Sequence, residues 1–196
     1  MSAKTGGQDK AIKIDLPGAT IDGDLTIPEE ATALVLFAHG SGSSRHSPRN
    51  RFVARGLHDA GLATLLMDLL TRKEEAEDIV TRRLRFDIDL LGERVVQVTD
   101  WLLEQEETRD LALGYFGAST GAAAALVAAA MRPEKAAAVV SRGGRPDLAG
   151  KALPDVTAPT LMIVGGNDVP VIGMNEEAMK QMNTEVKLEI VPGATH

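Results

Sequence analysis

The 196-residue sequence contains no cysteine. This excludes disulfide bonds, thiolate metal sites and cysteine nucleophiles, so any covalent chemistry has to come from another side chain such as serine. No apolar run approaches the ~18 residues of a membrane-spanning helix, and the opening MSAKTGGQDK lacks the apolar core of a secretory signal. We therefore expect one cytoplasmic domain over residues 1–196, with residues 1–10 as a disordered tail.

Basic residues are also scarce. The 21 lysines and arginines are outnumbered by 28 aspartates and glutamates, which gives a formal net charge of −7. Nucleic acids and anionic membrane surfaces require a basic excess, so neither is expected as a partner. A small-molecule substrate fits the composition better.

Apolar segments of strand length alternate with longer helical patterns. Two of them, Ala11–Leu16 and Ala19–Ile27, meet at Pro17-Gly18 and predict an antiparallel pair. The later predicted strands are Ala33–Ala38, Ala63–Met67, Leu111–Phe116, Ala136–Val140, Thr160–Val164 and Glu185–Val191. The helices predicted between them run from Ser47 to about Gly61 and over Asp87–Glu106, Thr120–Met131 and Asn175–Met182. Unbroken apolar strands joined by helices indicate an α/β fold with a largely parallel sheet, covered on both faces.

The segment Thr71–Arg85 is dense in charge, with the runs RKEEAED and TRRLR. Such a pattern is typical of a solvated connection or the start of a helix. We assign it no function.

The strongest functional signal is Gly117-Ala118-Ser119-Thr120-Gly121, which lies between a predicted strand and an alanine-rich helix. In a strand, GxSxG, helix arrangement the serine sits on a sharp strained turn, and small neighbours let the strand and helix approach closely. The same segment would also suit a glycine turn in which Ser119 merely caps a core helix. The context favours a nucleophile.

A serine nucleophile needs an imidazole base and a carboxylate that orients it. Asp168 follows the predicted strand Thr160–Val164 in the loop Gly-Gly-Asn-Asp, and His196 follows the last predicted strand in Pro-Gly-Ala-Thr-His. Reactive groups of such sheets gather beyond the carboxyl ends of the strands. We therefore predict a catalytic set of Ser119, Asp168 and His196.

Acyl transfer also needs donors for the oxyanion. The backbone amide of Thr120 is predicted to supply the first, and the loop after Ala33–Ala38 the second, with Ser41 as first choice and Gly42 as second. His39 is expected to hydrogen-bond its own loop, whereas His46 is predicted to face the substrate.

Four arginines lie on loops that should open beside Ser119: Arg45, Arg49, Arg142 and Arg145. Two interpretations remain open for them. Arginines that converge on the pocket would bind a carboxylate or phosphate of the substrate in bidentate fashion. Alternatively, they are surface residues paired with Asp or Glu.

At these residues the chain resembles an α/β-hydrolase, and within that superfamily the small, lidless dienelactone-hydrolase-like group. The resemblance runs from about residue 33 to residue 196 through HGSGSSRHSPRN, GYFGASTGAAAA, SRGGRPDLAG, IVGGNDVPV and VPGATH. It implies an eight-stranded, mostly parallel sheet, no lid domain, and hydrolysis of esters or lactones through an acyl-enzyme. No cofactor or metal is implied.

Two departures from the family pattern stand out. Dienelactone hydrolase proper uses cysteine where this sequence has Ser119, which favours a serine carboxylesterase. Relatives also continue past the histidine into a final helix, whereas this sequence ends at His196. We accordingly expect an uncovered apolar sheet face, through which a homo-oligomer could form.

The sequence thus predicts a serine hydrolase for small esters, lactones or thioesters. A non-catalytic binding or assembly protein on the same scaffold is one alternative. A nucleotide-binding domain is another, because Gly40-Ser41-Gly42 and Asp68 imitate a dinucleotide fingerprint, although Arg45 occupies the third glycine position.

Overall fold

The computed structural model describes residues 9–196, so the predicted tail lies almost wholly outside the described residues. Lys10 already belongs to a strand. That strand, β1 (Lys10–Leu16), pairs antiparallel with β2 (Ala19–Thr26), and Gly18 in the connecting turn has a positive φ of 76°. The predicted opening pair is confirmed.

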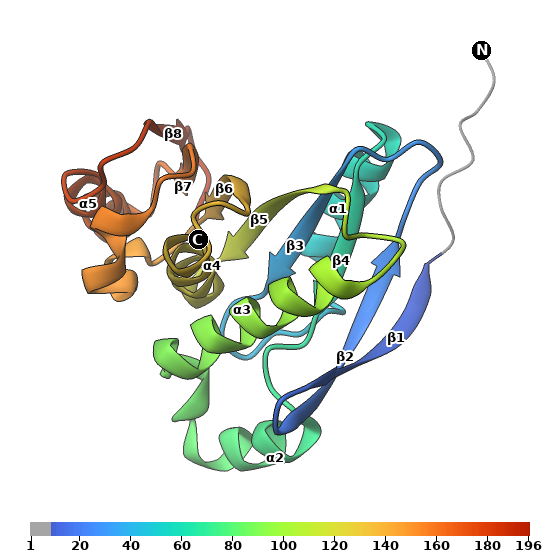
Figure 1. The fold of residues 1–196 in the computed structure, drawn as a ribbon. Coiled ribbons are helices and arrows are strands. Elements are labelled where there is room, and N and C mark those ends of the chain that lie inside the picture. Colours follow the sequence, from blue (N-terminus) through green and yellow to red (C-terminus); the bar gives the residue numbers. More distant parts are fainter. Residues whose placement is uncertain (1–8) are drawn as a thin grey trace.

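The described residues form one eight-stranded sheet in the order β1-β2-β4-β3-β5-β6-β7-β8 (Figure 1). The remaining strands are β3 (Ala33–Ala38), β4 (Ala63–Met67), β5 (Ala112–Ala118), β6 (Ala136–Arg142), β7 (Thr160–Gly165) and β8 (Val186–Val191). Neighbours from β4 to β8 run parallel, while β2 joins β4 antiparallel. This confirms the predicted α/β class and its mostly parallel sheet with an antiparallel start.

The helices are α1 (Pro48–Asp59), α2 (Arg72–Thr81), α3 (Ile88–Glu104), α4 (Thr120–Met131) and α5 (Val169–Met179), with 3₁₀ segments η1 (Leu84–Phe86) and η2 (Pro146–Asp155). The predicted start of α5, Asn175, is six residues too late. The helix begins directly after Asp168, and Pro170 lies in its first turn, where proline is tolerated. Within residues 9–196, none of these helices has the length and apolar character needed to cross a membrane.

Within the charged segment 71–85, residues 72–81 form helix α2 with a defined start, which agrees with the second of its two predicted interpretations. Thr71 caps α2: its side chain accepts from the backbone N–H of Glu74, and the Glu74 carboxylate accepts from the Thr71 N–H. Such a reciprocal capping box satisfies two of the four N–H groups that a helix start leaves free.

Alternating side chains of β3 divide the core between the two faces of the sheet. Leu34 and Leu36 belong to the large cluster under α3 and α4, whereas Val35 and Phe37 belong to the smaller cluster under α1. Figure 1 shows α3 and α4 on one side of the sheet and α1 on the other. Because helices cover both faces of the central strands, the polar loops that carry chemistry are confined to the strand ends.

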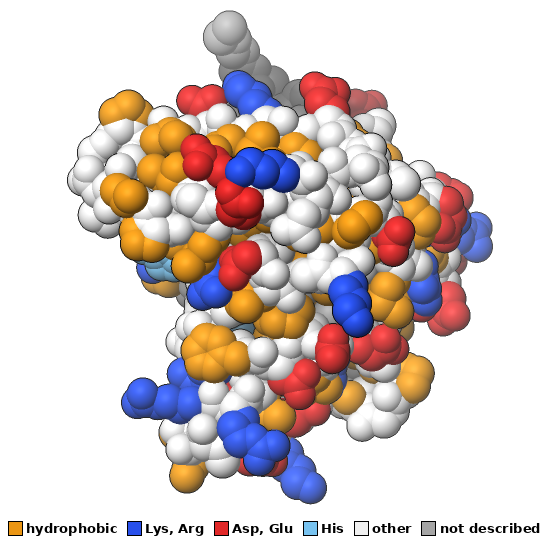
Figure 2. Space-filling view, turned by 90° about the vertical axis from the view of Figure 1, so that its left-hand side faces the viewer, with side chains coloured by type: hydrophobic (Ala, Val, Ile, Leu, Met, Phe, Trp, Pro, Cys, Tyr) orange, Lys and Arg blue, Asp and Glu red, His pale blue; other side chains and the backbone are white. Residues whose placement is uncertain are grey.

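At the far edge of the sheet, β8 pairs only with β7 among the described strands. Its Ile190 and Val191 are 42% and 40% exposed. Figure 2 shows the side of the molecule on which β8 and α5 lie, where hydrophobic side chains are found among acidic and basic ones. The expected association of copies through a sheet face stays a prediction.

Candidate active site

Ser119 occupies the turn between β5 and α4. Its backbone has φ 51° and ψ −121°, a conformation that costs a non-glycine residue about 1–3 kcal/mol. The turn is held by hydrogen bonds: Ser119 N–H donates to the Arg142 carbonyl at 3.2 Å, and the Ser119 carbonyl accepts from the Arg145 N–H at 3.1 Å. The strained turn agrees with the nucleophile interpretation, and the neighbouring β6 loop holds it in place.

The two glycines of the motif are required by space. A Cβ on Gly117 would lie 2.3 Å from the Ala122 Cα, and a Cβ on Gly121 would lie 2.3 Å from the Ala38 carbonyl oxygen. Both distances are shorter than real Cβ contacts allow. Strand β3, strand β5 and helix α4 can therefore meet under Ser119 only because these positions carry no side chain.

The structure brings together the three residues predicted as a catalytic set. His196 Nδ1 lies 2.8 Å from Asp168 Oδ2, and His196 Nε2 lies 3.3 Å from Ser119 Oγ. The Asp168 side chain is 15% exposed and that of His196 is 52% exposed, so the carboxylate is sheltered while the imidazole faces solvent. This is the geometry in which an imidazole can take the serine proton while the carboxylate orients the ring.

Close contacts between the loops after β7 and β8 position Asp168 relative to His196. Asn167 N–H donates to the Ala194 carbonyl at 2.9 Å, and its side-chain amide donates to the Gly193 carbonyl at 3.0 Å. Gly165 completes the contact, because a Cβ there would lie 2.5 Å from the Thr195 carbonyl oxygen. Asn167 is thus a positioning residue that the sequence analysis did not single out.

The amides predicted as oxyanion donors are available. Among residues 9–196, neither Ser41 N–H nor Thr120 N–H donates to another backbone group in the loops and helix caps. Thr120 is the first residue of α4, where an N–H has no partner inside the helix. Ser41 lines both the cavity beside Ser119 and a second, smaller cavity, whereas Gly42 lines only the smaller one of the two.

His39 takes part in the structure of its loop, as expected. Its Nδ1 donates to the Gly40 carbonyl at 2.9 Å and its Nε2 accepts from the Leu69 N–H at 3.1 Å. Burial lowers the pKa of His39, although the Gly40 carbonyl opposes this shift. The ring is therefore neutral and both of its nitrogens are engaged.

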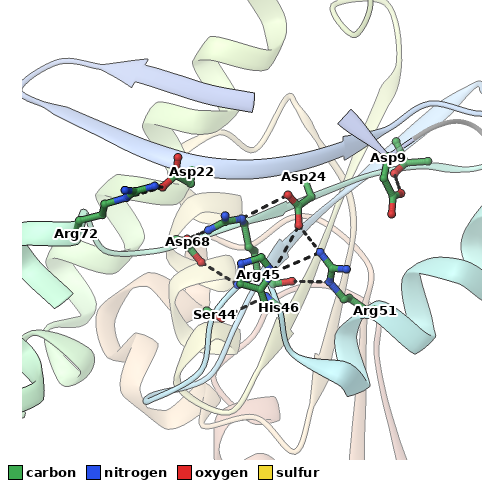
Figure 3. Close-up of polar contacts among 10 residues, drawn as sticks. Asp9, Asp22, Asp24, Ser44, Arg45, His46, Arg51, Asp68 and Arg72 are labelled. Carbon is green, nitrogen blue, oxygen red and sulfur yellow. Dashed lines mark hydrogen bonds and ion pairs between the residues drawn. The ribbon is translucent and has the colours of Figure 1, made fainter. Parts of the chain in front are cut away.

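Arg45 does not reach the cavity beside Ser119. Figure 3 shows its side chain between Asp24 of β2 and Asp68, which follows β4. The Arg45 N–H donates to Asp68 Oδ1 at 2.8 Å, its Nη1 donates to Asp68 Oδ2, and its Nε lies 3.4 Å from Asp24 Oδ1. Burial disfavours the charged guanidinium, but the two carboxylates outweigh it and raise the pKa of Arg45. The residue ties its loop to the sheet, and the predicted substrate contact is wrong.

Asp24 and Asp68, the aspartates that bind Arg45, also bear on the position of His46 and on the nucleotide alternative. His46 is 59% exposed, lies 4.0 Å from Asp24 Oδ2 and does not line the cavity beside Ser119, contrary to the prediction. Asp68, which a dinucleotide site would use to bind a ribose, is instead engaged by Arg45.

Arg142, the last residue of β6, and Arg145, in the loop after it, have different roles. Arg145 pairs with Asp147 through two hydrogen bonds of 2.9 and 2.8 Å and does not line the cavity, so its predicted substrate contact is also wrong. Arg142 lines the cavity, as predicted. Of the two interpretations left open, pairing with aspartate holds for Arg45 and Arg145, whereas Arg49 and Arg142 line the cavity.

The cavity beside Ser119 has a volume of about 260 Å³. Its lining residues are Gly40, Ser41, Ser43, Ser47, Arg49, Asn50, Ala118, Ser119, Arg142, Gly143 and His196. The sequence analysis missed Ser43, Ser47 and Asn50. A signal was present for the last two, because the first turn of a helix that directly follows an oxyanion loop points back at the site.

The match of a family model agrees with this geometry. The model of the dienelactone hydrolase family matches residues 21–196. The chain belongs to the dienelactone hydrolase family. A solved structure described as dienelactone hydrolase from Anabaena variabilis is 60% identical, with a TM-score of 0.95 over 97% of this chain and 88% of that one.

Other relatives extend the comparison. Est1E from Butyrivibrio proteoclasticus, solved with ferulic acid, shares the fold at a TM-score of 0.79 and 20% identity over 95% of this chain and 91% of that one. A curated protein of Mycobacterium tuberculosis strain H37Rv, named "Putative phosphoribosyl transferase", is 53% identical over 189 residues. The alignment covers 96% of this chain and 42% of that protein, so the chain spans less than half the length of this relative.

Proposed function

We propose that this member of the dienelactone hydrolase family is a serine hydrolase that cleaves small carboxylic esters, lactones or thioesters. The observation that carries the proposal is the continuous contact from Asp168 through His196 to the strained Ser119. Family membership supports hydrolase chemistry, and the serine in place of cysteine supports an ester substrate.

In each half of the proposed reaction His196 acts first as a base and then as an acid. Ser119 Oγ attacks the carbonyl carbon while His196 Nε2 takes its proton, and the Ser41 and Thr120 amides bind the oxyanion. The carbon–oxygen bond to the alcohol then breaks, and His196 returns the proton to the departing oxygen. Water repeats the sequence on the acyl-serine and releases the acid.

The same proposal places the hydrolase site in the part that the chain shares with the mycobacterial relative. The name of that relative refers to a protein more than twice as long as the shared region. Nothing in the proposed reaction requires a phosphoribosyl donor.

Asp168→Asn tests the role of the carboxylate. The amide retains the shape of Asp168 but holds the wrong tautomer of His196, so kcat/KM for p-nitrophenyl acetate should fall by about 10³- to 10⁴-fold. Asp147→Asn is the matched control, because Asp147 pairs with Arg145 outside the cavity, and it should retain activity within about threefold of the wild type. Equal rates for the two variants would remove Asp168 from the mechanism.

A further inference from the structure

The cavity beside Ser119 contains unbalanced positive charge. Its lining residues include Arg49 and Arg142 but no aspartate or glutamate, and Arg49 Nη1 contacts only the His196 carbonyl oxygen, at 3.5 Å, among the hydrogen bonds of the described residues. Arginines on a protein surface ordinarily find carboxylate partners, as Arg45 and Arg145 do nearby. The absence of an acid on this lining is the first indication that the counter-charge is to come from a ligand.

Arg142 is the better defined of the two cations. It ends β6 beside the Ser119 turn, it forms no ion pair among residues 9–196, and its Nε is buried without a hydrogen-bond partner there. Burial and the positive charge of Arg49 lower the pKa of Arg142. An unpaired buried donor on a charged group costs free energy. A ligand oxygen that accepts a hydrogen bond from Arg142 Nε would remove this cost.

The first turn of α1 also lines the cavity and adds positive charge to it. Ser47, Arg49 and Asn50 line the cavity, so the positive end of the helix dipole is directed at it. Asn50 is 2% exposed, and its Oδ1 has no hydrogen-bond partner among the described residues. The cavity therefore offers two guanidinium groups and a helix N-terminus to an anion, whereas the unpartnered Asn50 Oδ1 is an acceptor and contributes nothing to anion binding.

The position of His196 indicates which part of an ester enters this cavity. Under the proposed function, on which this step rests, His196 protonates the departing alcohol oxygen. His196 lines the cavity that also has Arg49 and Arg142 in its lining. It does not line the small cavity of about 20 Å³ whose lining includes Leu70 and Thr120. The alcohol part thus belongs beside Arg142, and the small cavity leaves room for a short acyl group.

We propose that the substrate is a short-chain carboxylic ester whose alcohol carries a phosphate group, bound by Arg142 and Arg49. A phosphate monoester carries nearly two negative charges at neutral pH, which matches two arginines, and guanidinium groups bind phosphate oxygens in bidentate fashion. Only the carboxylic ester bond is hydrolysed, so the products are a carboxylic acid and the intact phosphorylated alcohol.

Three acetate esters with different leaving groups test the proposal. They are 4-acetoxyphenyl phosphate, 4-acetoxybenzoate and the neutral 4-methoxyphenyl acetate. The rate of acetate release from each ester is measured with the wild type, Arg142→Met and Arg145→Met. The phosphate ester should have the highest kcat/KM. In Arg142→Met the ratio of its kcat/KM to that of the neutral ester should fall by about 10- to 100-fold, which corresponds to losing a hydrogen-bonded charge pair.

Arg145→Met is the matched control, since Arg145 lies three residues further along the same loop and pairs with Asp147. Its selectivity ratio should stay within about threefold of the wild type. A wild type that prefers the neutral ester, or a ratio that Arg142→Met does not change, would overturn the phosphate proposal and leave the hydrolase intact. A preference for the benzoate ester would also overturn the phosphate proposal, because the site would then select a single negative charge.

Binding of phenyl phosphate gives a second readout that does not depend on turnover. Titration calorimetry should show binding to the wild type and to Arg145→Met, and affinity at least tenfold weaker for Arg142→Met. If none of the esters is hydrolysed while phenyl phosphate binds in this pattern, the proposed function fails and the anion site stands. No binding to the folded wild type would contradict the site itself.

Discussion

Ser119→Ala should reduce kcat/KM for p-nitrophenyl acetate by about 10⁴-fold or more, the largest effect expected of any single substitution on activity. The methyl side chain removes the only atom that can form the acyl-enzyme, while the oxyanion amides and the cavity stay in place. Residual hydrolysis should come from these groups alone. The rates are measured by p-nitrophenolate release, with uncatalysed hydrolysis subtracted.

The fold should survive this substitution, because the Ser119 side chain makes no hydrogen bond that caps α4. The free energy of unfolding of Ser119→Ala, measured in urea, should stay within about 1 kcal/mol of the wild type. A folded variant that retains the wild-type rate would show that hydrolysis takes place without this nucleophile.

Gly121→Ala should give the largest loss of stability, about 3 kcal/mol or more, or no folded protein at all. The added Cβ would lie 2.3 Å from the Ala38 carbonyl oxygen and 2.4 Å from that of His39. These are backbone atoms of β3 and its loop, which cannot move without disturbing the sheet. Urea denaturation measures the change.

Gly56→Ala is the matched control for a glycine inside a helix. Gly56 lies within α1, and a Cβ there would meet no atom within 4 Å. Because alanine restricts the unfolded chain and favours a helix, this variant should be more stable than the wild type by about 0.5–1 kcal/mol. If both glycine variants had the same stability, steric exclusion at Gly121 would not be the reason for the GxSxG motif.

Most of the sheet could be predicted from the sequence because each buried strand is a continuous apolar run between glycine-rich turns. The bounds predicted for β3 and β4 agree with the structure. Helix α5 was harder, since Gly173 interrupts its interior and Pro170 lies in its first turn, so the apolar pattern becomes clear only from Asn175 onward.

The candidate site was predictable where function depends on local sequence. Ser119 is marked by its glycines, and Asp168 and His196 follow strands in the chain order that this fold uses. The parallel sheet then places all three strand ends at one edge, which the structure shows with contacts of 2.8 and 3.3 Å. The position of each residue soon after the end of a strand was therefore sufficient to predict that the three side chains meet.

The role of Arg45 could not be predicted, because its partners are distant in sequence. Arg45 binds Asp24, 21 residues earlier, and Asp68, 23 residues later. Arg85 is engaged by the buried Asp78, while Arg142 has no such partner among residues 9–196. For Arg45 the packing of β2 and β4 against its loop supplies both carboxylates, which no local sequence pattern indicates.

Labelling with a fluorophosphonate tests most directly whether Ser119 is an activated nucleophile. The reagent forms a bond from the serine oxygen to phosphorus with loss of fluoride, and it reacts fast only where a base activates the hydroxyl. Mass spectrometry after trypsin digestion should find a single adduct on the peptide of residues 110–135, in which Ser119 is the only serine. The adduct should be absent from Ser119→Ala and strongly reduced in Asp168→Asn. An unmodified Ser119 in the folded wild-type protein, as a non-catalytic scaffold would give, would contradict the account.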